Sequence, residues 1–71
     1  MNVGDLTYDV VTESIWIIVN RWYSSLSDEY LYEIKKVDEP NVAVVINENT
    51  LSYMRADFLK RTNSVLYKSV E

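Results

Sequence analysis

Apolar and polar residues alternate with a period of two over much of this chain, a pattern typical of strands that bury one face. The segment that follows Gly4-Asp5 places Leu6, Tyr8 and Val10 between polar residues and predicts a short strand at about 5–11. Residues 42–46, VAVVI, are nearly all β-branched and predict a second, clear strand.

The stretch SIWIIVNRWYSSL, residues 14–26, fits two templates. Its apolar residues match the helical spacing i, i+3, i+4, i+7, but residues 15–19 are β-branched apart from one Trp, which favours a strand. We expect a central strand at 15–19, with Trp22 and Tyr23 at the rim of the loop SSLSDE. The alternative is an α+β fold with a helix at about 13–26 and a β-hairpin.

The next segment, EYLYEIKKVDEP, is also ambiguous. Ser27 could cap a helix with acidic residues in its first turn and lysines in its last. As a strand, the segment places Tyr30, Tyr32 and Ile34 on one face. We favour the strand, because the turn signal DEPN at 38–41 would join it to the strand at 42–46 as a hairpin.

The C-terminal third predicts a turn, NENT, at 47–50, a short strand, LSYM, at 51–54 and a helical or 3₁₀ turn within RADFLKR at 55–61. SVLYKSV at 64–70 predicts a last strand. Five or six short strands with one helical turn indicate an all-β domain over residues 1–71, built as a small barrel.

The order of these elements resembles the small SH3-like barrels that occur as stand-alone proteins of tailed bacteriophages. The likeness is carried by Gly4-Asp5-Leu6, by Ile17-Ile18-Val19, by Tyr32 with Ile34, and by Asp57 with Leu59. It departs where Ser14-Ile15-Trp16 replaces the usual glycine and where 38–41 replaces an Asp-Gly turn. The resemblance implies an SH3-like fold and a phage-encoded protein, and it leaves the function open, because such barrels serve many functions.

The amino-acid composition limits the classes of function that we expect for this chain. The 71 residues contain no His and no Cys, and 11 acidic against 7 basic residues give a net charge of −4. We therefore expect no catalytic site, no metal site and no cofactor. The longest apolar run, 15–19, is too short to span a bilayer, and the N-terminus lacks the features of a signal peptide, so we expect a cytoplasmic protein without membrane contact.

Nine aromatic residues are more than so small a core can easily enclose, and exposed aromatic rings favour protein binding. We expect Trp16 to be mostly buried and Trp22 to be partly exposed. The leading hypothesis is an interaction module for a host or viral protein, with Trp22, Tyr23, Tyr30 and Tyr53 as binding residues. Two alternatives remain open: a nucleic-acid-binding barrel that uses Arg55, Lys60 and Arg61, and a structural protein that forms homo-oligomers through unpaired strand edges.

Overall fold

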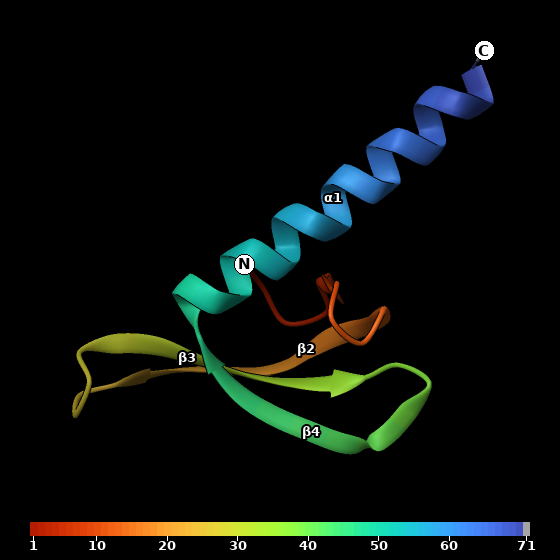
Figure 1. Cartoon of the computed structure of the whole chain (residues 1–71). Helices are drawn as coiled ribbons and strands as arrows, with labels where there is room; N and C mark the ends of the chain where they lie inside the picture. Colours follow the sequence, from red (N-terminus) through yellow and green to blue (C-terminus); the bar gives the residue numbers. More distant parts are fainter. Residues whose placement is uncertain (71) are drawn as a thin grey trace.

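The computed structural model describes the backbone of residues 1–70 and side chains as far as Thr62. In this part of the chain, four strands precede one helix (Figure 1). The strands are β1 (Leu6–Asp9), β2 (Ser14–Ser24), β3 (Glu29–Lys36) and β4 (Glu39–Asn47), and α1 spans Glu48–Val70.

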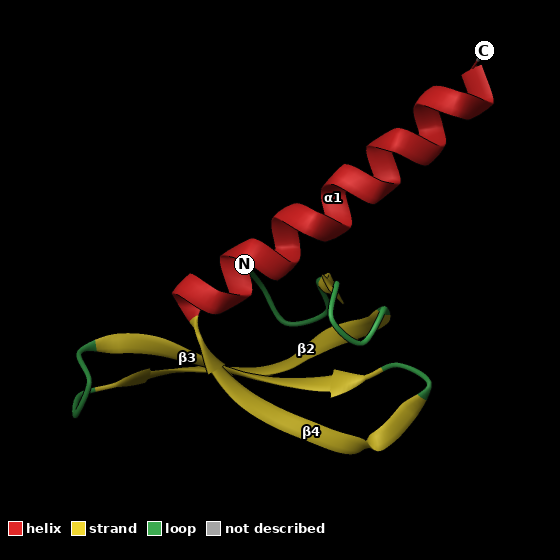
Figure 2. Cartoon of the chain, viewed as in Figure 1, coloured by secondary structure: helices red, strands yellow, loops and turns green. Residues whose placement is uncertain are grey.

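The strands form one antiparallel sheet in the order β1-β2-β3-β4, in which each strand pairs with its neighbours in sequence (Figure 2). Trp16 pairs with Thr7 in β1, and Ile18 pairs with Ile34 in β3. A register shift between Ile18 and Asn20 marks a β-bulge. The bulge changes which residues of β2 share a face, so that Arg21 and Tyr23 lie on the same face as Trp16 and Ile18.

One face of the sheet carries the core. Four of its side chains are buried against Leu51 of α1, and Met1, Ile46 and Met54 pack around them. Full burial of a large apolar side chain stabilises a fold by about 1.5–3 kcal/mol, so this small cluster is the main source of stability. The buried sheet residues are Trp16, Ile18, Tyr32 and Ile34.

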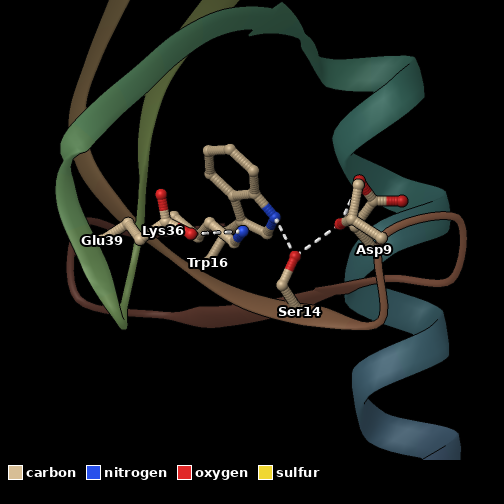
Figure 3. Close-up of polar contacts among 6 residues, drawn as sticks. Asp9, Ser14, Trp16, Lys36 and Glu39 are labelled. Carbon is tan, nitrogen blue, oxygen red and sulfur yellow. Dashed lines mark hydrogen bonds and ion pairs between the residues drawn. The ribbon is translucent and has the colours of Figure 1, made fainter.

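Polar contacts fix the end of the core at the β1–β2 turn. The indole Nε1 of Trp16 donates to Ser14 Oγ at 3.2 Å, and the Thr12 hydroxyl bonds to both Ser14 and Asp9. Figure 3 shows the buried indole beside Ser14. The prediction that Trp16 is mostly buried is confirmed, since its exposed fraction is 7%.

Helix α1 begins directly after β4, without an intervening loop. Asn47 is its N-cap, because the side-chain Oδ1 accepts a hydrogen bond of 2.9 Å from the Thr50 amide. Glu48, in the first turn, accepts a 2.8 Å bond from the hydroxyl of the buried Tyr32. The carboxylate therefore fastens the start of the helix to the sheet and also lies at the favourable end of the helix dipole.

The β-rich class is confirmed, as are strands within 5–11, at 15–19, at 30–36 and at 42–46. The predicted helix alternatives over 13–26 and from Ser27 are both wrong. The DEPN turn lies earlier than expected, at Val37-Asp38, and β4 already begins at Glu39. In the described residues the strands form a single open sheet of four, rather than five or six strands.

The predictions for the C-terminal third are wrong in three places. NENT is the cap and first turn of α1, and both LSYM and SVLYKSV lie in this helix instead of forming strands. RADFLKR is helical as expected, but as the middle of a long helix. The physical reason is that Leu51, Met54 and Phe58 follow helical spacing and lie among good helix formers, so the apparent alternation in LSYM was too short to be informative.

Replacement of the N-cap gives a first prediction. Asn47→Ala should lower the free energy of unfolding by about 1 kcal/mol, because the Thr50 amide loses its partner, whereas Asn47→Asp should change it by only a few tenths. Urea denaturation measures both. Asn41→Ala, at the other end of the same strand, is the matched control, and an equal loss in that variant would contradict the cap assignment.

Tyr32 gives a second prediction. Burial raises the pKa of the Tyr32 hydroxyl above its ordinary value of 10.0. The unfolded chain therefore loses this proton first, so stability should be complete below pH 10 and should fall as the pH rises above it.

Tyr32→Phe should cost about 1 kcal/mol at pH 7 through the lost hydrogen bonds. The same variant should show a shallower fall in stability than the wild type between neutral and strongly alkaline pH, measured by urea denaturation. Tyr53→Phe controls for loss of an exposed hydroxyl at pH 7. Parallel pH profiles for Tyr32→Phe and the wild type would refute the role of this hydroxyl.

Candidate functional site

The end of the β2–β3 hairpin gathers the exposed aromatic side chains of the sheet. Tyr23 pairs with Tyr30 across the two strands, and their rings meet edge to face with centroids 5.5 Å apart. Tyr30 remains 37% exposed and Tyr23 51% exposed. Figure 1 shows this hairpin end projecting past the first turn of α1, so the helix does not cover it.

Arg21 contacts one ring of the tyrosine pair, that of Tyr30. Its guanidinium lies 4.1 Å from the centroid of the Tyr30 ring, and its Nε donates to the hydroxyl of Tyr32 at 3.3 Å. The hydrogen bond to Tyr32 raises the pKa of Arg21 above its ordinary value. An exposed cation–π contact of this kind is worth about 0.5–1 kcal/mol. The Tyr32 hydroxyl in turn donates to Glu48, so Arg21 and Tyr32 connect the hairpin end to the start of the helix.

The turn between the strands is tightly held and carries an apolar tip. Asp28 has a φ of 53°, in the left-handed region that aspartate tolerates better than most residues, and its carboxylate accepts a hydrogen bond from the Tyr23 hydroxyl. Leu26 lies in this turn with its side chain 100% exposed. The turn held by this hydrogen bond therefore presents a leucine between the strand ends that carry the two tyrosines.

Trp22 lies on the reverse face of the same hairpin. It pairs with Leu31, so its side chain alternates with those of Arg21 and Tyr23, which lie on the helix side of the sheet. Its exposed fraction of 37% confirms the expected partial exposure. The expected position at a loop rim was wrong, because β2 continues to Ser24. We call Trp22, Tyr23, Leu26 and Tyr30 together the hairpin surface.

The structure separates Tyr53 from this group. Tyr53 follows the buried Leu51 by two residues, about 200° around the helix axis, so it faces away from the sheet. Its side chain is 69% exposed. Of the four predicted protein-binding residues, the fold thus brings Tyr23 and Tyr30 into contact, places Trp22 behind them and leaves Tyr53 elsewhere.

Two members of the predicted basic set are engaged with β1. Arg55 donates to the backbone oxygen of Leu6 at 2.7 Å, and the Arg61 guanidinium lies 3.8 Å from the centroid of the Tyr8 ring. Lys60 is exposed, one position before Arg61 on the helix. The three side chains do not form one free cationic patch, and binding of nucleic acid stays a prediction.

A shallow depression of about 220 Å³ lies at the opposite end of β2, between the turns that carry Glu13 and Asp38. Two carboxylates line it, but in the described part of the chain no three His, Cys, Asp or Glu side chains gather to hold a metal ion. Within the same part, no helix is long and apolar enough to cross a membrane. The absence of catalysis, metals and cofactors stays an expectation from composition.

Sequence reasoning missed Leu26 and Arg21 as members of the site. Leu26 was considered only as one of the apolar residues of 14–26 that match helical spacing. A leucine flanked by serines in a predicted loop was itself a signal of an exposed apolar side chain. Arg21 gave no signal, because its position beneath Tyr30 depends on the bulge after Ile18. Comparison of the chain with protein-family models, with curated proteins and with solved structures found no match.

Proposed function

We propose that this chain is a small non-enzymatic interaction module that binds another protein through its hairpin surface. The observation that carries the proposal is the fully exposed Leu26 on the turn between the two strands that carry the edge-to-face pair Tyr23 and Tyr30. Aromatic side chains lose little conformational entropy on binding and bury large areas, so they dominate the energetics of many interfaces.

Preorganisation supports this proposal. Arg21 fixes Tyr30 from below, and the Asp28 carboxylate fixes the hydroxyl of Tyr23, so a partner would meet rings that are already in place. Binding then costs less ordering of side chains than it would on a flexible loop.

The charge around the hairpin indicates the chemistry of the partner. Asp28 and Glu29 border the tyrosines, and the whole chain carries a net charge of −4. A protein with an apolar pocket and a basic rim would complement this surface. The resemblance to tailed-phage SH3-like barrels adds the proposal that the protein is phage-encoded, that its partner is a host or viral protein and that its sheet belongs to the SH3-like class.

Affinity capture from bacterial lysate tests the proposal. The immobilised wild-type chain should retain a protein that the variants Leu26→Asp and Tyr30→Ala lose. Because Leu26 is fully exposed, its replacement should leave the free energy of unfolding unchanged within about 0.5 kcal/mol.

Tyr53→Ala is the matched control, since it removes an exposed tyrosine outside the hairpin surface and should retain the same protein. Binding of the purified captured protein is then measured by calorimetry, with an expected loss of at least tenfold in affinity for Leu26→Asp. Equal affinity for Leu26→Asp and the wild type, or capture of nothing by the wild type, would overturn the proposal.

A further inference from the structure

The two edges of the sheet differ in how they are covered. Along β1, Arg55 of α1 donates to the Leu6 carbonyl oxygen and Arg61 lies over Tyr8. Along β4, residues 39–45 are all exposed, and in the described part of the chain the sheet order ends at this strand. Figure 1 shows β4 along the lower margin of the sheet, with only its C-terminal end at α1. Its outward backbone N–H and C=O groups are therefore available to another strand.

The sequence of this edge lacks the usual protection against pairing. Proteins guard exposed edges with charged side chains, bulges or prolines. The segment NVAVVIN at 41–47 contains no charged residue and no proline, although the register shift between Lys35 and Lys36 places an irregularity of β4 between Glu39 and Ala43. Pro40 stands immediately before this segment and limits where pairing can begin. The regular part of the edge that remains open is the uncharged segment 43–47.

Residues 41–47 can pair with the same residues of an antiparallel second copy so that similar side chains lie opposite each other. Antiparallel pairing centred on Val44 places Val44 opposite Val44, Val42 opposite Ile46 and Ala43 opposite Val45. At the two ends, Asn41 lies opposite Asn47; the Oδ1 of Asn47 caps α1, so its Nδ2 group is the one that donates to Asn41. Every cross-strand pair is then apolar with apolar or amide with amide, the combination that stabilises a sheet.

We propose that two copies of this chain associate through β4, antiparallel and around a two-fold axis at Val44, to form one continuous eight-stranded sheet. The symmetry is isologous, so each copy contributes the same residues. The axis runs perpendicular to the sheet, and both helices lie on the same face of the dimer.

Burial in the dimer accounts for the exposed valines of β4. Val44 and Ile46 pair with the buried Ile34 and Tyr32 and therefore lie on the helix side of the sheet, and Val44 is 41% exposed in one copy. In the pair, these side chains lie next to their equivalents between the two helices. Each copy carries a net charge of −4, and the uncharged edge lets the copies meet without opposing like charges across the paired strands.

The size of the contact sets its strength. A strand pairing of at most seven residues per copy is smaller than a standard interface, which buries about 800 Å² per partner. We therefore expect a dimer that dissociates on dilution. The dimer surface uses no residue of the hairpin surface, so this inference stands independently of the proposed binding function.

Sedimentation velocity of the wild-type chain from micromolar to millimolar concentration tests association, and the weight-average mass should rise toward twice that of the chain. Val44→Lys should remain a monomer, because the axis places two lysines side by side. Val44→Glu should also remain a monomer, whereas an equimolar mixture of the two variants should dimerise. Val11→Lys, at an exposed turn position, controls for the added charge and should dimerise like the wild type.

Disulfide trapping tests the register, because the chain has no cysteine of its own. Under oxidised glutathione, Val44→Cys should form a covalent dimer, whereas Val42→Cys should not, since its thiols lie well apart in this register. Leu26→Asp should dimerise normally, which separates this surface from the hairpin surface. A wild-type monomer at millimolar concentration, a dimer of Val44→Lys, or cross-linking of Val42→Cys in place of Val44→Cys would overturn the inference.

Discussion

Burial of one sheet face under the first turns of α1 is the constraint on which the rest of the structure depends. A four-stranded meander cannot enclose a core by itself, and here the helix that follows β4 covers it, together with Met1 of the N-terminal segment. Leu51 is the helix residue that completes the cluster of Trp16, Ile18, Tyr32 and Ile34. The position of the helix start is therefore decisive, and the cap at Asn47 together with the Tyr32–Glu48 hydrogen bond fixes it.

A single helix cannot cover the whole sheet evenly, and this asymmetry explains where the exposed apolar groups lie. From its start beside β3 and β4, α1 runs toward β1, where Arg55 bonds to the edge of the sheet (Figure 1). The hairpin end of β2–β3 and the free edge of β4 are left outside this cover. Both surfaces follow from the direction of one helix, although one presents aromatic rings and the other presents backbone groups.

The sequence predicted the strands well, because β-branched composition and alternation act locally. Residues 15–19 and 42–46 could form little else, and the choice of strand over helix for 14–26 followed from β-branching rather than periodicity. The long helix was missed because no short segment of it is distinctive. An asparagine that caps a helix, such as Asn47, is the same in sequence as an asparagine in a turn. The four residues LSYM fit both the period of a strand and the period of a helix. Only a longer segment distinguishes a helix from a strand here, and the helical spacing of apolar residues from Leu51 to Phe58 correctly indicates a helix.

The candidate site was predictable in composition but not in geometry. Exposed aromatics could be expected from their number, whereas the pairing of Tyr23 with Tyr30 depends on a bulge that shifts the register by one residue. Without that bulge, Arg21 and Tyr23 would lie on the opposite face, and Trp22 would lie opposite Tyr30. A one-residue irregularity after Ile18 therefore decides whether Tyr23 or Trp22 lies opposite Tyr30, and the other ring lies on the reverse face. No local sequence signal marks this irregularity.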